Sequence, residues 1–275
     1  MLRLWVGVTL ITALFGTLLV TTERHPGLRS GDPEWPRKIL HIGMGIAALC
    51  APRLFANPWP FVLLTAGFTL FMVAARLSQP LKKICRRTIH GVGRKSLGDI
   101  CFPFGVGLLC LFSRGDSFFY GIPMLILTLA DAAAALVGRS YGRLKYANFG
   151  SEKSLEGSLA FFTTSWACVF VPLFLFSEVG LLRLVTISLT LSLVLALVEA
   201  VSGNGLDNLV VPLAAYFLLR TFLFLPAVEL LLQLAFTLIL TFLFAISYLN
   251  ASLPHSTRAR IDYGKWTNAF GRPGN

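Results

Sequence analysis

Charged residues are scarce in this chain: Asp, Glu, Lys and Arg together make up 13% of its 275 residues, about half the usual share of a soluble domain. Hydrophobic residues make up 55%, and the mean hydropathy is +0.72. Long apolar runs recur along the whole length. This composition excludes a soluble globular enzyme, a disordered chain and a collagen-like chain. We therefore expect a polytopic membrane protein.

Cysteine is also sparse, and its spacing carries no signature of a metal site. The five cysteines form no C-x-x-C pair and no Cys/His pattern. They are Cys50, Cys85, Cys101, Cys110 and Cys168. We expect free thiols that pack as small hydrophobic side chains, with neither a disulfide framework nor a metal.

Apolar windows close to the length of a membrane-spanning helix, about 20 residues, occur nine times. They cover 4–21, 39–55, 60–76, 99–113, 118–137, 158–176, 181–201, 209–225 and 229–249. The sequence thus predicts an all-α bundle of about nine transmembrane helices. The second and fourth windows are short and interrupted by Gly or Pro, so each is expected to be a partial or tilted span. The first window is interpreted as an uncleaved anchor, because no small-residue cleavage site follows it.

The net charge of +11 is concentrated on one face of this predicted bundle. Of the 24 Lys and Arg residues, 19 lie in or at the edge of four segments: 22–38, 77–98, 138–157 and 250–275. The positive-inside rule makes that face cytoplasmic, with the N-terminus outside and the C-terminus inside. The excess charge therefore suits an anionic membrane surface better than nucleic acid. The predicted organisation is an anchor and linker at 1–35, a membrane-embedded catalytic domain at 36–249 and a basic cytoplasmic tail at 250–275.

The most informative stretch is 129–162, where an acid inside an apolar run precedes a glycine-punctuated basic loop. The acid is Asp131, and the loop carries Arg139, Arg143, Lys145 and Lys153. A carboxylate at that depth is costly unless it is paired, solvated or bound to a cation. The loop offers cations and backbone N–H groups to polyphosphate oxygens, and a helix beginning near Ser158 favours anions. Alternatively, the cations merely follow the positive-inside rule.

A second constellation lies in 197–213, where Glu199, Asp207 and Asn208 are expected at the same face and depth as Asp131. Acidic oxygens beside a basic phosphate loop are what Mg²⁺ and a nucleoside triphosphate require. Asp207 is alternatively the N-cap of the following helix.

Cations also stand at the starts of the second and fourth windows. Lys38 and His41 lie in 36–45, and Lys95 lies in 94–107. We expect them to meet an acceptor hydroxyl or a phosphate at the membrane interface. The alternatives are cations that snorkel to the interface and a histidine satisfied within the core.

Together these motifs resemble the CTP-dependent polyprenol kinases, a family that includes dolichol kinases, phytol and farnesol kinases and CTP-using diacylglycerol kinases. They are R-K-x-x-H at 37–41, D-A-A-A-A-L-V-G-R-S-Y-G-R-L-K at 131–145, K-S-L-E-G-S at 153–158 and G-L-D-N-L-V-V-P-L at 205–213. The resemblance covers residues 36–220. It implies transfer of the γ-phosphoryl group of Mg²⁺-CTP to the hydroxyl of a lipid alcohol in the bilayer.

The resemblance also implies roles for individual residues. Asp131, Glu199 and Asp207 are expected to bind Mg²⁺ or orient the acceptor hydroxyl. The residues expected to bind the nucleotide are Arg139, Gly142, Arg143, Lys145, Lys153, Ser154, Glu156, Gly157, Ser158 and Asn208. Lys38, His41 and Lys95 are expected to meet the acceptor or the product phosphate.

Two other functions remain as alternatives. The central stretch is also similar to phosphatidate cytidylyltransferases, but their C-terminal signature contains a His and an Arg that 199–213 lacks; this departure favours the kinase. A membrane transporter is the third interpretation. Charges spread over both faces would support it, whereas here they are concentrated on one face. The sequence leaves open the lipid alcohol, the oligomeric state, and whether the membrane is a bacterial inner membrane or a eukaryotic internal one.

Overall fold

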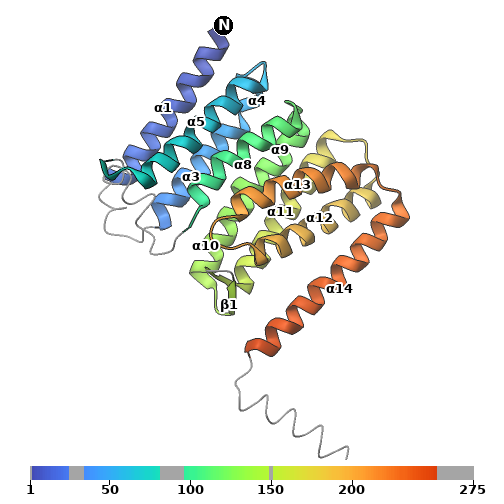
Figure 1. The fold of residues 1–275 in the computed structure, drawn as a ribbon. Coiled ribbons are helices and arrows are strands. Elements are labelled where there is room, and N and C mark those ends of the chain that lie inside the picture. Colours follow the sequence, from blue (N-terminus) through green and yellow to red (C-terminus); the bar gives the residue numbers. More distant parts are fainter. Residues whose placement is uncertain (1, 25–33, 81–95, 149–150, 253–275) are drawn as a thin grey trace, which may run out of the picture.

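The structure is a computed structural model that describes residues 2–24, 34–80, 96–148 and 151–252. Its elements are α1 (Leu2–Arg24), α3 (Glu34–Leu49), α4 (Ala51–Leu54), α5 (Pro58–Leu77), α8 (Gly98–Ser113), α9 (Ser117–Leu125), the π-helical turn η1 (Ile126–Ala130), α10 (Asp131–Tyr141), β1 (Lys145–Asn148), β2 (Ser151–Ser154), α11 (Leu155–Phe176), α12 (Leu181–Val201), α13 (Asp207–Phe224) and α14 (Ala227–Ser252). In Figure 1, α1, α3, α5 and α8 lie on one side of the bundle and α11, α12 and α13 on the other, while α14 runs at an angle to them.

The helical fold expected from hydropathy is confirmed, but the count of nine spans is not. Each of the nine predicted windows falls on helix. Seven helical segments within the described ranges are long and apolar enough to cross a membrane. The two short windows correspond to α3 and α8, which have 16 residues each. Nine crossings and the sidedness of the bundle therefore stay predictions. A small antiparallel hairpin, β1 with β2, was not expected.

Side-chain caps fix where several helices begin. Asn57 accepts a hydrogen bond from the backbone N–H of Trp59, and Pro58 follows it at the first helical position. Asp116 accepts from the N–H groups of Phe118 and Phe119 at the start of α9. These are preferred residues at helix N-termini, because their oxygens satisfy donors that lack a partner within the helix.

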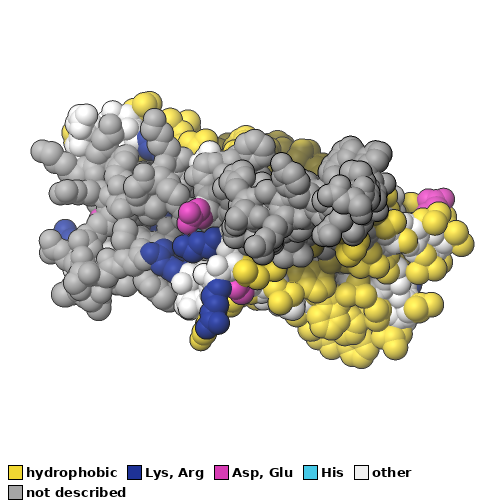
Figure 2. All heavy atoms as spheres, turned by 90° about the horizontal axis from the view of Figure 1, so that it is seen from below, with side chains coloured by type: hydrophobic (Ala, Val, Ile, Leu, Met, Phe, Trp, Pro, Cys, Tyr) yellow, Lys and Arg dark blue, Asp and Glu magenta, His cyan; other side chains and the backbone are white. Residues whose placement is uncertain are grey.

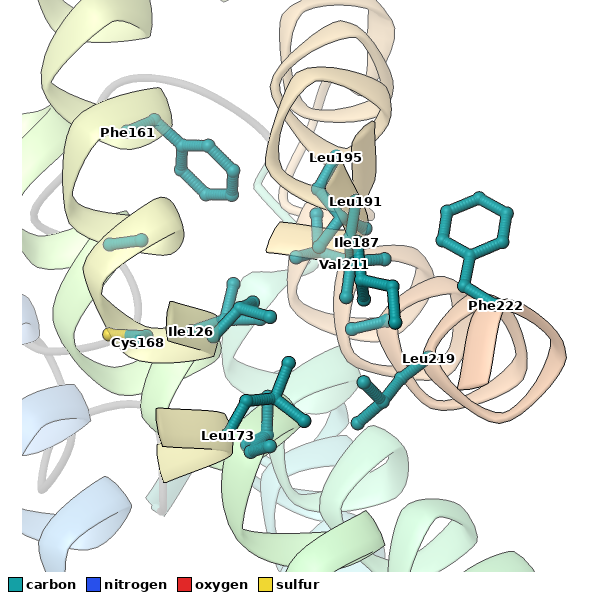
Figure 3. Packing of buried hydrophobic residues seen from close by; sticks show 14 of the residues in the cluster. Ile126, Phe161, Cys168, Leu173, Ile187, Leu191, Leu195, Val211, Leu219 and Phe222 are labelled. Carbon is teal, nitrogen blue, oxygen red and sulfur yellow. The ribbon is translucent and has the colours of Figure 1, made fainter. Parts of the chain in front are cut away.

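Two large hydrophobic clusters hold the helices together, with a third, small one of Leu19, Leu40 and Ala75. The larger one joins α9, η1, α10, α11, α12 and α13 and includes Ile126, Phe161, Leu191, Val211 and Leu219 (Figure 3). The second joins α1, α3, α5, α8 and α9. Inside a bilayer such contacts act through close packing, since lipid tails are as apolar as these side chains. Among the described cysteines, Cys101, Cys110 and Cys168 are free and buried, as expected, whereas Cys50 is free but exposed; Cys85 lies outside the described residues.

Glycines allow two close helix contacts that shape the end of the bundle where α8, α11 and α13 begin. A Cβ on Gly105 of α8 would lie 2.7 Å from the backbone oxygen of Asn208 on α13. A Cβ on Gly157 of α11 would lie 2.9 Å from the backbone oxygen of Ala134 on α10. Such spacing follows the small-residue rule for membrane helices. As a result, the starts of α8, α11 and α13 and the end of α10 gather at one end of the molecule.

Candidate active site

A polar cavity of about 660 Å³ lies at that end of the bundle. Its wall contains five Lys or Arg residues and four Asp or Glu residues. They are Arg37, Lys38, Arg139, Lys145 and Lys153, and Asp131, Glu152, Glu199 and Asp207. Figure 2 views this end and shows Lys and Arg side chains beside acidic ones, next to hydrophobic surface. The volume falls within the range of about 300–1,000 Å³ typical of ligand sites.

On one wall, a lysine and a histidine of α3 meet the buried acid of α10. Lys38 Nζ donates to Asp131 Oδ2 at 2.6 Å, and His41 Nε2 lies 3.3 Å from the same oxygen. The three side chains are 11%, 8% and 16% exposed, in the order Lys38, His41, Asp131. A buried carboxylate needs a partner of opposite charge. For Asp131 this partner is Lys38.

A π-helical turn sets the position of Asp131. The turn η1 ends at Ala130, immediately before Asp131, and follows Pro123 of α9. His41 Nε2 lies 3.0 Å from the backbone oxygen of Leu127 within this turn. A π-turn inside an α-helix is rare and frequent at functional sites. It rotates the following residues about the helix axis, and here His41 anchors the irregular turn to α3.

On the opposite wall, Lys153 of the hairpin binds two acids. Its Nζ donates to Glu199 Oε1 at 2.5 Å and also contacts the backbone oxygen of Glu199. Asp207 Oδ2 lies 3.5 Å from the same ammonium group. Glu199 Oε2 is buried and has no hydrogen-bond partner within the described part of the chain. One oxygen of this cavity-lining carboxylate is therefore unpartnered.

The loop between α10 and α11 is built around Ser154 and Glu156. Ser154 Oγ accepts from the N–H of Gly157 and so caps α11. A Cβ on Gly142 would lie 2.0 Å from the backbone oxygen of Gly138 and 2.7 Å from Ser154 Oγ, so glycine is required there. Glu156 accepts from the backbone N–H groups of Arg143 and Leu144 at 3.0 and 3.2 Å. The start of α11, which favours anions, is thereby fixed at the cavity.

A left-handed turn before α13 closes the cavity. Asn204 and Gly205 have φ angles of +56° and +82°. A Cβ on Gly205 would lie 2.5 Å from the Cα of Gly98, and Leu97 N–H donates to the oxygen of Asn204 at 2.6 Å. Asn208 Nδ2 donates to the oxygen of Gly98 at 3.1 Å. Close contacts thus join the start of α8 to the start of α13. They leave no room for a side chain at position 205.

A buried network holds Arg37 at the edge of the cavity. Arg37 Nη1 donates to Ser96 Oγ at 2.9 Å. Arg76 of α5 binds both carboxylate oxygens of Asp99 and the backbone oxygen of Ser96. Because a bidentate Arg–carboxylate pair fixes geometry as well as charge, Arg76 and Asp99 position Ser96 and, through it, Arg37.

The structure brings most of the predicted site residues to one cavity. The predicted residues that line it are Lys38, Asp131, Arg139, Gly142, Lys145, Lys153, Ser154, Glu199, Asp207 and Asn208. The others that are described lie outside its wall: His41, Arg143, Glu156, Gly157 and Ser158. Gly157 serves the contact between α10 and α11, and Ser158 Oγ lies 2.6 Å from Tyr146 Oη. Lys95 lies outside the described residues.

Several lining residues were not among the predicted site residues: Arg37, Ser96, Ala134, Ala135, Gly138, Glu152, Asn204 and Gly205. Arg37 adjoins Lys38 in the same interfacial motif, so the sequence did carry a signal for it. Asn204 and Gly205 lie in the reversal S-G-N-G-L-D-N, which is typical of a tight turn. The positions of Ser96 and Glu152 depend on tertiary packing, for which the sequence offered no signal.

The donor set suits Mg²⁺ bound together with phosphate. In the described part of the chain, no three His, Cys, Asp or Glu side chains are arranged to hold a metal by themselves. The three acids therefore do not form a single cluster: Glu199 and Asp207 share Lys153, while Asp131 pairs with Lys38. Mg²⁺ usually takes one or two carboxylates plus water and substrate phosphates. The unpartnered Oε2 of Glu199 beside Asp207 fits that requirement.

A cavity lined by carboxylates and cations at one end of a helical membrane protein suits an integral membrane enzyme that acts on phosphorylated substrates. Comparison with known proteins narrows this class. The chain is 35% identical to a phytol kinase of Synechocystis sp. over 217 residues, which are 78% of this chain and 90% of that protein. It is 31% identical to CTP-dependent diacylglycerol kinase 1 of Saccharomyces cerevisiae over 207 residues, 65% of this chain and 70% of that protein.

No protein-family model matches the chain, and no solved structure matches it. The extent of the phytol kinase match is nonetheless decisive: the chain belongs to the phytol kinase family of membrane lipid kinases. This confirms the resemblance that the four motifs indicated.

Proposed function

We propose that this protein transfers the γ-phosphoryl group of CTP to the hydroxyl of a single-chain prenol such as phytol, at the cavity described above. CTP is the nucleotide named for the yeast relative, and phytol is the acceptor named for the cyanobacterial one. The observation that carries the proposal is the cavity of about 660 Å³ where Lys38–Asp131 and Lys153–Glu199–Asp207 face one another.

The triphosphate fits the basic part of the cavity. Arg139, Lys145 and Lys153 line it, and the N-termini of α11 and α13 begin at lining residues. Cations and helix N-termini both favour phosphate oxygens. Glu199 and Asp207 would hold Mg²⁺ against the phosphates, where the ion supplies charge neutralisation. Arg37 and Lys38 remain for the acceptor side of the cavity.

Asp131 is assigned to the acceptor. The alcohol oxygen attacks the γ-phosphorus as the bond from that phosphorus to the β-phosphate oxygen breaks, so that CDP leaves and a lipid monophosphate forms. Asp131 accepts the proton that the alcohol loses, while Lys38 stabilises the phosphate charge beside it. Because phosphoryl transfer depends mostly on positioning and electrostatics, a lysine–aspartate pair held by burial suits this step.

The cavity is expected to face the cytoplasm, where CTP is available. The basic segments that the positive-inside rule assigns to the cytoplasm include 138–157, which contains the hairpin and the end of α10. The proposal thus places soluble nucleotide at the membrane surface and lipid acceptor within the bilayer.

The proposal is tested with purified protein, CTP labelled at the γ-phosphate, and a panel containing phytol, farnesol, dolichol, diacylglycerol and phosphatidate. Label is expected in phytyl or farnesyl monophosphate, with an equal amount of CDP released. ATP labelled at the same position serves as the nucleotide control.

Two outcomes would overturn the proposal. Pyrophosphate release with phosphatidate, and no label in any alcohol, would make the protein a cytidylyltransferase. Absence of label from every lipid under conditions where CTP binding is measurable would exclude the kinase activity itself.

A further inference from the structure

A narrow apolar slot lies beside the polar cavity, within the bundle. It has a volume of about 80 Å³ and lies between α1, α3, α5 and α8. Arg37, Lys38 and Asn208 line both the slot and the polar cavity. The two spaces therefore adjoin one another at α3 and α13.

The slot runs along α3 into the apolar interior. Its wall on that helix extends from Arg37 to Ala48, a span of about 16 Å at 1.5 Å per residue. Leu40 and Met44 of α3 face Phe68 and Met72 of α5 across it. The far end is closed by Phe61, which is 2% exposed. The ring of Phe61 packs in turn against the ring of Phe55, with the two centroids 5.6 Å apart.

His41 is one of the polar residues that line this slot, together with Arg37, Lys38, Thr65, Asp99 and Asn208. Its ring packs against Phe102 with centroids 4.5 Å apart, while its Nε2 lies 3.3 Å from Asp131 Oδ2. A hydroxyl bound beside His41 would thus reach Asp131, and an attached hydrocarbon chain would point down the slot. A site for a lipid alcohol needs polar groups at the phosphate for the hydroxyl and an apolar path for the chain. Both are present here.

We propose that this slot is the acceptor groove, and that a single-chain lipid alcohol lies in it with its hydroxyl at His41 and its tail directed towards Phe61. The inference rests on the proposed function and adds the residues that select the acceptor. The slot is far smaller than the usual ligand site of about 300–1,000 Å³, so even a single prenyl chain enters only when neighbouring side chains move. Met44 and Met72 are the adaptable side chains that move aside for one chain, and Phe61 limits its length.

The activity test introduces a bulky side chain halfway along the slot. Met44→Trp is compared with Ile46→Trp, which changes the same helix at a side chain 53% exposed to the outside of the bundle. Relative kcat/KM is measured for geraniol, farnesol, geranylgeraniol and phytol. Met44→Trp is expected to lower the phytol-to-geraniol ratio by about tenfold or more. Phe61→Leu is expected to raise activity with the longest prenols, and Ile46→Trp is expected to keep the wild-type profile.

A second measurement does not depend on catalysis. A prenol carrying a photoreactive diazirine at its tail end is cross-linked to wild-type protein in nanodiscs, with excess phytol as competitor. Labelling is expected on α3 near Ala48 and on α5 near Phe61, and phytol is expected to suppress it.

The outcomes separate this inference from the proposed function. Identical chain-length profiles for Met44→Trp and Ile46→Trp would overturn the groove while leaving the kinase intact. Labelling confined to the outer surface of the bundle would overturn it as well. A wild-type protein that labels at Phe61 but transfers no phosphate from CTP would support the groove and exclude the proposed reaction.

Discussion

Lys153 shows how single residues determine this site. Its ammonium group is 13% exposed and faces Glu199, which is 8% exposed, and Asp207. A buried ion pair contributes little net stability, but removing one partner leaves a charge that is both desolvated and unpaired. The arrangement is thus costly to alter, whatever it binds.

Replacement of Lys153 is therefore expected to affect stability and activity separately. Lys153→Met should lower the free energy of unfolding by about 3–5 kcal/mol, because Glu199 loses its partner. The double variant Lys153→Met/Glu199→Gln should recover most of this loss, because the buried charge is gone, and should still show no phosphoryl transfer. Thermal unfolding in detergent and label transfer from CTP measure the two effects.

The exposed pair of Lys145 and Glu152 provides the matched control for stability. These side chains are 62% and 73% exposed and 3.5 Å apart. Lys145→Met should change stability by no more than about 1 kcal/mol, since water screens such pairs. Equal losses for Lys145→Met and Lys153→Met would contradict the assignment of Lys153 to a buried site.

At the scale of elements, the irregular segments carry the site and the regular helices support it. The π-turn η1 positions Asp131, and the turn at Asn204 and Gly205 joins α13 to α8. Hydropathy predicts membrane helices because most of their residues face the same apolar environment, the bilayer, and are therefore apolar themselves. It does not predict η1, which follows Pro123 of α9 and contacts His41 of α3.

The turn before α13 offers a direct test at this scale. Gly205→Ala should destabilise the protein by about 1–3 kcal/mol, because φ is +82° and the added Cβ would meet Gly98. The KM for CTP should rise, since Gly205 and Asn208 line the cavity.

Gly121→Ala is the control for this change. Gly121 lies within α9 and has no neighbouring atoms within 4 Å of an added Cβ. The substitution should leave activity unchanged and stabilise the helix by about 1 kcal/mol. If both variants behaved alike in thermal unfolding and in CTP kinetics, the strained turn would have no role in the site.

At the scale of the whole molecule, the sequence predicted the helical bundle better than it predicted which residues contact one another. Each apolar window became a helix, because hydrophobicity and length are local properties. The site depends on contacts that are far apart in the chain: Lys38 and Asp131 are separated by 93 residues and Lys153 and Glu199 by 46. The motifs placed these residues at one face, but only packing shows that the acids divide between two lysines.

The predicted sidedness of the molecule is testable with cysteines at the two ends of one helical segment. Ser117 and Ser140 are both exposed and lie at opposite ends of the span Ser117–Tyr141, about 35 Å apart along the helix. In a background without native cysteines, an impermeant maleimide should label Ser117→Cys on intact cells. Ser140→Cys should react only after permeabilisation. The reverse pattern would contradict the orientation derived from the positive-inside rule.

The most direct test of the account is the rate of phosphoryl transfer from γ-labelled CTP to phytol by purified wild-type protein and the Asp131→Asn variant. Wild type should yield phytyl monophosphate and CDP in equal amounts. Asp131→Asn should lower the rate by at least about 100-fold, with unchanged affinity for CTP. Asp116→Asn, which keeps a helix cap at the other end of the bundle, should retain full activity. Transfer by Asp131→Asn at the wild-type rate would contradict the central claim.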